Sequence, residues 1–243
     1  MDWWIWLLWL VGAFLCGSIP FAVLIGLAKG VDIRRHGSGN PGASNLGRQV
    51  GRKWGLLCFL LDVGKGLVPT LLFGLMLSSR AWSEAVQPAG APASESMPEG
   101  WAWQWVLVAV AAVLGHVFSP WLGFKGGKGV ATGLGATLGL FPVVTVPGGL
   151  AFGIWYAVCR LTGYVGLASV VAAASLPVTT AFSGMLLGLS IGETLVFVGL
   201  TAALAGLVIY RHRGNLARLR QGVEPKAAWT QRPPRESARQ AVD

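Results

Sequence analysis

Charged residues are scarce in this sequence. They make up 12% of its 243 residues, whereas 53% are hydrophobic and the mean hydropathy is +0.60. A soluble domain of this length needs a polar surface, and 19 Lys and Arg with 10 Asp and Glu residues are too few to cover one. The same figures exclude an intrinsically disordered chain. The composition therefore predicts an integral membrane protein.

Cysteine is also rare. Cys16, Cys58 and Cys159 lie within or beside apolar runs and have no CxxC spacing. An odd number of cysteines placed in this way argues against a disulfide framework and against a metal site. Sequences typical of other chemistries are missing too, since the chain contains no HExxH, no GxxxxGK[ST] and no His-x4-Asp. We interpret the cysteines as small packing residues and expect neither a metal nor a cofactor.

Long apolar runs, in contrast, are abundant. Six of them reach or approach the roughly 20 residues that a membrane helix needs. They cover residues 3–28, 54–79, 100–124, 129–159, 161–192 and 194–210. Pro20 is expected to kink the first run, and Asp62 and Lys65, three residues apart, could pair inside the second. The fourth run contains Pro142 near its middle, so it could cross the membrane once or turn back as two short helices.

The distribution of positive charge favours the second arrangement. If the fourth run crosses twice, 17 of the 19 Lys and Arg residues share one face of the membrane. If it crosses once, this asymmetry vanishes. Because Lys and Arg concentrate in cytoplasmic loops, we predict an all-α integral membrane protein with seven transmembrane helices, its N-terminus outside and its C-terminus cytoplasmic. Residues 1–221 are predicted to form one membrane domain with cytoplasmic catalytic loops, and residues 222–243 a mobile cytoplasmic tail.

Polar residues gather in three segments on the predicted cytoplasmic face. Residues 36–48 hold four glycines, whose backbone N–H groups can form an anion-binding concavity beside Arg48. Residues 123–129 place lysines and backbone amides at the start of a helix, where the helix dipole favours an anion. Residues 210–220 begin where the last apolar run ends. Together they predict a phosphate-binding site, although each segment alone could be an ordinary basic loop or a juxtamembrane helix held on anionic lipid.

The three segments resemble the bacterial acyl-phosphate-dependent glycerol-3-phosphate acyltransferase family, also known as the PlsY family. The matching stretches are Gly17–Phe21, Asp32–Arg48, Leu61-Asp62, Lys65-Gly66, Gly115-His116, Phe124–Thr132, Leu167–Ser169, and His212 with Asn215, Gly222 and Glu224. They occur in the family's order across most of residues 12–226. The sequence departs from the family pattern at Gly166, where the resemblance predicts a serine.

The resemblance implies an activity, substrates and a location. A fatty acyl group would pass from acyl phosphate to the 1-hydroxyl of glycerol 3-phosphate, which gives lysophosphatidic acid and phosphate and opens phospholipid synthesis. The expected partners are these two substrates and the lipid bilayer, with no nucleic acid. The enzyme would be a multi-pass protein of the bacterial inner membrane, with its active site facing the cytoplasm.

The resemblance also assigns site residues, position by position. Those matching the glycerol 3-phosphate site are Ser38, Arg48, Lys128, Ser169, His212 and Asn215. Those matching the acyl-phosphate headgroup site are Gly39, Asn40, Gly42, Ser44, Asn45, Gly126, Gly127 and Gly129. The residues expected to be catalytic are Lys128, Ser169, His212 and Asn215.

The chemistry of these substrates suggests a mechanism. Acyl phosphate is an activated mixed anhydride, so the protein has mainly to neutralise charge and align the reactants. We hypothesise that Asn215 orients the attacking hydroxyl while the donor's own phosphate oxygen accepts its proton, with His212 as the alternative base. The rival hypothesis is a membrane transporter of a phosphorylated metabolite. Against it, no inverted repeat is visible and the polar motifs crowd one face instead of the membrane midplane.

Overall fold

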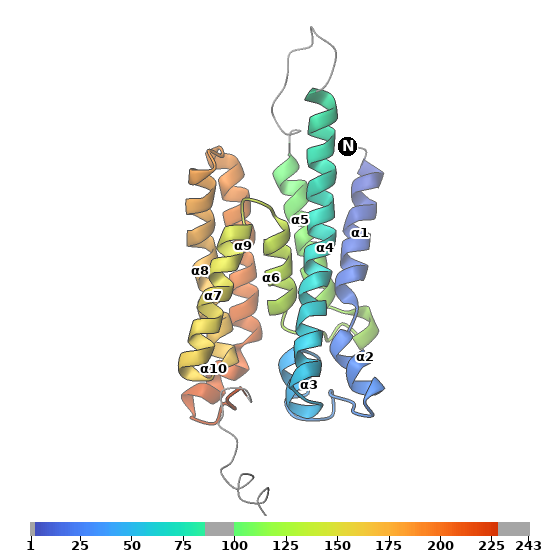
Figure 1. The fold of residues 1–243 in the computed structure, drawn as a ribbon, viewed down its shortest axis with the longest axis vertical. Coiled ribbons are helices and arrows are strands. Elements are labelled where there is room, and N and C mark those ends of the chain that lie inside the picture. Colours follow the sequence, from blue (N-terminus) through green and yellow to red (C-terminus); the bar gives the residue numbers. More distant parts are fainter. Residues whose placement is uncertain (1–2, 86–99, 228–243) are drawn as a thin grey trace, which may run out of the picture.

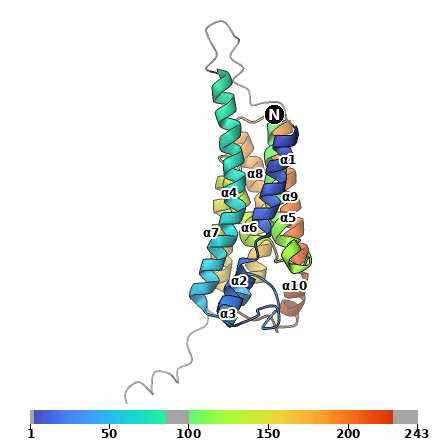
Figure 2. The same ribbon diagram turned by 90° about the vertical axis from the view of Figure 1, so that its right-hand side faces the viewer.

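A computed structural model describes residues 3–85 and 100–227, and this part of the chain is entirely helical apart from its turns and loops. The helices are α1 (Trp3–Ser18), α2 (Phe21–Ala28), α3 (Ala43–Gln49), α4 (Arg52–Ala85), α5 (Trp101–Val117), η1 (Pro120–Leu122), α6 (Val130–Gly139), α7 (Thr145–Thr162), α8 (Val165–Leu186), α9 (Ile191–Arg211) and α10 (Arg213–Arg220). The long helices run side by side along one axis (Figure 1), and the short helices α2, α3 and α10 lie together at one end of the bundle in both Figure 1 and Figure 2.

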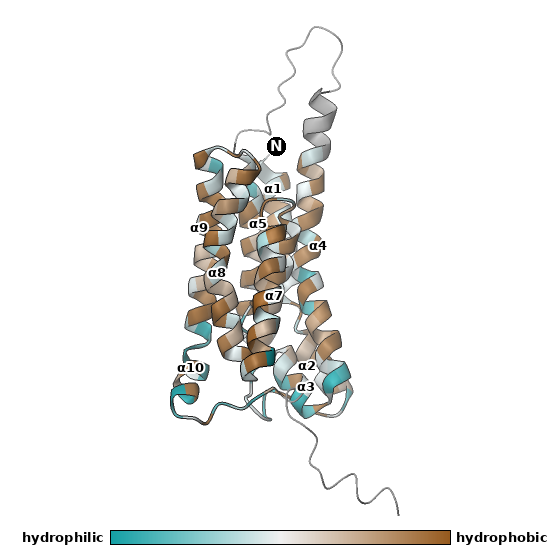
Figure 3. Ribbon diagram, turned by 60° about the vertical axis from the view of Figure 1, so that its left-hand side comes forward, coloured by the Kyte–Doolittle hydropathy of each residue, from teal (hydrophilic) through white to brown (hydrophobic). Residues whose placement is uncertain are grey.

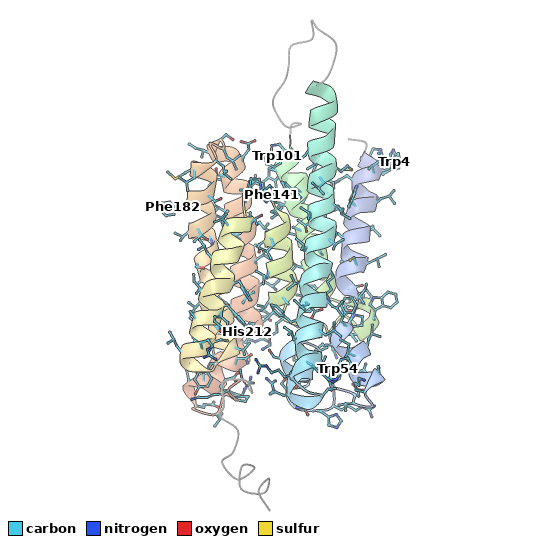
Figure 4. All side chains as sticks on the ribbon, in the orientation of Figure 1. Trp4, Trp54, Trp101, Phe141, Phe182 and His212 are labelled. Atoms are coloured by element: carbon cyan, nitrogen blue, oxygen red, sulfur yellow. The ribbon has the colours of Figure 1, made fainter. Side chains whose placement is uncertain are left out.

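The bundle has the outer surface of an integral membrane protein. Within the described residues, five helical stretches are long and apolar enough to cross a membrane: 3–28, 52–78, 101–122, 165–186 and 191–211. Many large hydrophobic side chains of the long helices are exposed. Hydrophobic residues predominate along these helices, whereas hydrophilic residues gather at the end that carries α2, α3 and α10 (Figure 3). Trp4 and Trp101 lie near one end of the bundle and Trp54 lies near the other (Figure 4), as expected for residues at the two interfaces of a bilayer.

The first apolar run is broken where the sequence predicts a kink. Helix α1 ends at Ser18 and α2 begins at Phe21, so Pro20 stands in the break. Proline cannot donate a backbone hydrogen bond, and its ring clashes with the carbonyl group of the preceding helical turn. The expected kink is confirmed.

The fourth apolar run forms two helices, α6 and α7, instead of one. The chain leaves α6 at Gly139 and turns back through residues 140–144, which include Pro142, before α7 begins at Thr145 (Figure 1). Helix α6 has ten residues. They rise about 15 Å, which is half of a hydrocarbon core about 30 Å thick. This short helix packs against α4, α5 and α7.

Glycine allows α4 and α6 to approach closely. A Cβ atom at Gly66 would overlap the backbone oxygen of Thr132, and one at Gly135 would overlap the backbone oxygen of Val63. Helices in membranes associate through such small residues, because lipid offers no hydrophobic drive between them. The contact fixes the start of α6, and with it Lys128, against α4.

A buried ion pair joins the core of the bundle. Asp62 and Lys65 in α4 pair as expected, with Lys65 Nζ 2.7 Å from Asp62 Oδ1. The same ammonium donates to the backbone oxygen of Ile19 at 2.7 Å, and His116 Nδ1 lies 3.8 Å from Asp62 Oδ1. Charges inside a membrane protein are costly unless they are paired in this way. The cluster ties α4 to the break between α1 and α2 and to the end of α5.

Candidate active site

The three polar segments meet around one cavity. It has a volume of about 510 Å³ and lies between α4, α6, α7, α8 and α9, next to α3 and α10. All residues predicted to bind glycerol 3-phosphate line it: Ser38, Arg48, Lys128, Ser169, His212 and Asn215. Of the residues predicted to hold the acyl-phosphate headgroup, those that line it are Asn40, Gly42, Ser44, Asn45 and Gly129. Gly39, Gly126 and Gly127 do not line it.

Asn45 holds the first segment in shape. Its side chain is buried, accepts the backbone N–H of Ser38 at 3.1 Å and donates to the backbone oxygens of Ile33 at 2.8 Å and His36 at 3.1 Å. All of these partners lie within the segment or beside it. Arg48 follows one helical turn later, and its Nη2 donates to Ser38 Oγ at 3.4 Å. The loop thus presents a hydroxyl and a guanidinium together, which suits a phosphate group.

The second segment is fixed through its glycines. The N–H groups of Gly126 and Gly127 donate to the backbone oxygens of Val117 at 3.0 Å and His116 at 3.2 Å. Their own carbonyl oxygens both accept from Arg211 Nη2 at 2.9 Å. A Cβ atom at Gly127 would overlap the imidazole of His116, so only glycine fits there. The hydrogen bonds of the two glycines hold the loop against α5 and Arg211, while Lys128 and Gly129 line the cavity.

Lys128 links the second segment to the third. Its ammonium donates to Asn215 Oδ1, and Asn215 Nδ2 donates to Glu224 Oε1 at 2.6 Å. Glu224 Oε2 accepts from Arg218 Nε at 2.8 Å. Burial lowers the pKa of Lys128 to about 8, because a charged ammonium is less stable away from water; the carboxylate of Glu224 partly opposes this shift. Near neutral pH the ammonium remains mostly charged and can bind an anion.

His212 is held as a neutral imidazole. Its side chain is buried, between the helices near the end that carries α10 (Figure 4), and its Nδ1 lies 2.8 Å from the backbone oxygen of Val208. A carbonyl oxygen can only accept, so Nδ1 carries the proton and Nε2 has a free lone pair. Burial, and after it the charge of Lys128, lower the pKa of His212 to about 4. The imidazole is therefore unprotonated at neutral pH.

Ser169 reaches the cavity from α8. Its hydroxyl donates to the backbone oxygen of Val165 at 2.8 Å and accepts from Trp155 Nε1 at 3.3 Å. One turn earlier, a Cβ atom at Gly166 would lie 2.8 Å from the Cβ of Asn215. Glycine at this position, where the resemblance predicts a serine, lets α8 approach Asn215 closely.

Several residues that line the cavity were not among the predicted site residues, and those that make polar contacts there include Trp155, Arg211, Arg218 and Glu224. Glu224 could have been found from the sequence, because it is one of the residues that match the family motif. It was instead included in the predicted tail, residues 222–243. The Glu224 side chain is 6% exposed and paired with Arg218, and the N–H of Ala227 donates to the backbone oxygen of Gly163 at 2.8 Å. These contacts pack residues 222–227 against the site, and residues 228–243 lie outside the described part of the chain.

The far side of the cavity is apolar. Phe59 of α4 and Phe152 and Trp155 of α7 stack on one another, with ring centroids 5.9 to 6.3 Å apart. Beyond them the wall continues through Ala172 and Leu176 of α8. Within the described residues, no group of three or more His, Cys, Asp or Glu side chains is placed to hold a metal ion. A cavity that is cationic at one end and apolar at the other fits a ligand with an anionic head and a hydrocarbon chain.

Comparisons with known proteins agree with this geometry. Residues 7–222 match the family model described as glycerol-3-phosphate acyltransferase. Curated proteins of that name include one from Geobacter sulfurreducens, 40% identical over 212 residues, covering 87% of this chain and 92% of the relative. Another, from Trichlorobacter lovleyi, is 41% identical over 220 residues and covers 90% of this chain and 96% of the relative.

Two crystal structures are similar over the same region. Both are of PlsY (YgiH), an integral membrane glycerol 3-phosphate acyltransferase, one in a glycerol 3-phosphate form and one in a lysophosphatidic acid form. The TM-scores are 0.70 and 0.68, at 33% and 32% identity. Each alignment covers 91% of this chain and 95% of the other.

Proposed function

The chain belongs to the glycerol-3-phosphate acyltransferase family, and from this premise we propose that its acyl donor is acyl phosphate and its product lysophosphatidic acid. The fatty acyl group passes to the 1-hydroxyl of glycerol 3-phosphate, and inorganic phosphate is released. The observation that carries the proposal is the single cavity that joins a cluster of cations to an aromatic and aliphatic wall. Both substrates are anionic at one end, and the donor also has a hydrocarbon chain.

The polar end of the cavity supplies charge for two phosphate groups. Arg48 and Lys128 face it, and no carboxylate in the described part of the chain forms an ion pair with either, whereas Arg218 is paired with Glu224. Two phosphates held at once repel each other, so cations must offset that repulsion before the reacting atoms can approach. Charge-assisted hydrogen bonds from Arg and Lys are the strongest available for this purpose.

The proposed chemical step needs no covalent enzyme intermediate. The 1-hydroxyl oxygen attacks the acyl carbon, the bond between that carbon and the phosphate oxygen breaks, and the departing phosphate takes the hydroxyl proton. Asn215 orients the hydroxyl, and its own amide is held by Lys128 and Glu224. His212 is the alternative base, because its Nε2 carries a lone pair at neutral pH.

We also propose seven crossings, with the N-terminus outside, the C-terminus in the cytoplasm and the active site facing the cytoplasm of a bacterial inner membrane. The crossings are α1 with α2, α4, α5, α6, α7, α8 and α9. The gathering of hydrophilic residues at the end formed by α2, α3 and α10 supports this orientation (Figure 3). Two single-cysteine variants, Lys125→Cys and Arg213→Cys, test this topology, and both should react with a thiol reagent added on the cytoplasmic side. Reaction of the two variants from opposite sides of the membrane would refute both the topology and the shared site.

The activity can be tested on the purified full chain in detergent. We expect phosphate release from palmitoyl phosphate only when glycerol 3-phosphate is present, together with lysophosphatidic acid detected by mass spectrometry. Lys128→Met should lower kcat/KM at least about 100-fold, the upper part of the range for losing one charged hydrogen-bond partner. Lys125→Met is the matched control, since Lys125 is exposed in the same loop. Flux of glycerol 3-phosphate into vesicles without turnover would favour the transporter instead.

A further inference from the structure

The hydroxyl of Ser169 is oriented by a tryptophan from another helix. A hydroxyl has one proton to donate and two lone pairs. In Ser169 the proton goes to the backbone oxygen of Val165 at 2.8 Å, and one lone pair accepts from Trp155 Nε1 at 3.3 Å. A single lone pair therefore remains, and its direction is set by the other two bonds. Ser169 can offer that lone pair to a donor in the cavity, such as a substrate hydroxyl.

The indole of Trp155 is itself held in place. Its ring stacks on Phe152 with a centroid distance of 5.9 Å and an interplanar angle of 12°, and on Phe59 at 6.3 Å and 15°. Phe59 belongs to α4, so the stack reaches across the cavity from α7. Aromatic rings fixed in this way lose little further freedom when they hydrogen-bond. The N–H of Trp155 is thus aimed at Ser169 before any substrate binds.

We propose that Trp155 is a positioning residue for the acceptor substrate: it orients the Ser169 hydroxyl toward glycerol 3-phosphate while its ring forms part of the apolar wall. One side chain then joins the two halves of the cavity, with its polar edge on the acceptor side and its ring on the acyl side. This inference rests on the proposed function, because it assigns the free lone pair of Ser169 to the substrate of that reaction.

A double-mutant cycle tests the inference. Trp155→Phe keeps an aromatic ring in the stack but removes the N–H. We expect kcat/KM for glycerol 3-phosphate to fall about fivefold, the equivalent of about 1 kcal/mol for one neutral hydrogen bond. The KM for palmitoyl phosphate should stay within about twofold, since the ring contact remains. In the Ser169→Ala background, Trp155→Phe should cause no further loss, because the partner of the N–H is already gone.

The controls separate this role from a general effect on folding. Trp103→Phe makes the same change at an exposed tryptophan of α5 outside the cavity, and it should leave the kinetics unchanged. The melting temperatures of all variants are measured in the same detergent. Equal kcat/KM for wild type and Trp155→Phe, or losses that multiply in the double variant, would overturn the inference. Absence of acyl transfer by the wild type would instead refute the proposed function.

Discussion

The pH dependence of turnover should report the charge state of Lys128. Its pKa is lowered to about 8, mainly because the ammonium is buried. A lysine is charged below its pKa and neutral above it, so phosphate binding should weaken as the pH rises. With a pKa of about 8, the charged fraction falls from about nine tenths at pH 7 to about one tenth at pH 9. We expect kcat/KM for glycerol 3-phosphate to fall about tenfold over that interval.

The assay measures kcat/KM from initial rates of phosphate release at saturating palmitoyl phosphate, between about pH 6.5 and pH 9.5. A phosphate monoester has its second pKa near 6, so glycerol 3-phosphate stays mostly dianionic throughout and adds little to the profile. Spontaneous hydrolysis of the acyl phosphate is subtracted with an enzyme-free blank. The profile of kcat/KM then reports groups of the free enzyme.

Two variants assign the alkaline loss to Lys128. Lys128→Arg should remove it, whatever the absolute rate, because a guanidinium stays charged over the whole range. Lys125→Arg, the same change at the exposed lysine of the loop, should retain it. If the loss persisted in Lys128→Arg, or if the wild type showed none up to pH 9.5, Lys128 would not be the cation that binds the acceptor phosphate.

Three further substitutions test the surroundings of the site. Arg211→Met frees the carbonyls of the second segment and should lower kcat/KM at least about tenfold in the phosphate-release assay. Arg220→Met, the same change at an exposed arginine that does not line the cavity, should not. His212→Ala should cost only about tenfold if the donor phosphate accepts the proton; a loss above about 10⁴-fold would make His212 the base. Asp62→Ala leaves Lys65 buried without its partner and should destabilise the fold by about 3 to 5 kcal/mol, seen by denaturant unfolding in detergent. An unchanged unfolding midpoint would contradict that pairing.

Features set by neighbouring residues could be predicted from the sequence. The break at Pro20 follows from the covalent geometry of proline, and the pairing of Asp62 with Lys65 follows from their three-residue spacing on one helix. The turn at residues 140–144 was one of two options and was favoured by the distribution of positive charge; the structure has two helices, α6 and α7, on either side of it. Lys128, Asn215 and the other predicted site residues near them were identified by their match to the family motifs, and in the structure they line one cavity.

Other features depend on where distant backbone atoms lie. Gly126 and Gly127 were predicted to offer N–H groups to a phosphate, but the end of α5 takes those N–H groups and Arg211 takes the carbonyls. No spacing rule relates Trp155 to Ser169, which meet only because α7 packs beside α8.

Glu224 falls within residues 222–243, which were predicted to form a tail, and its carboxylate accepts hydrogen bonds from Asn215 and Arg218 beside the cavity. The sequence by itself determined that this protein lies in a membrane, where its helices break and which Lys and Arg residues could bind a phosphate. Composition and local geometry suffice for these features. Only the tertiary structure decided which hydrogen-bonding groups are already paired and which remain free for a substrate, because that depends on how helices distant in the chain pack together.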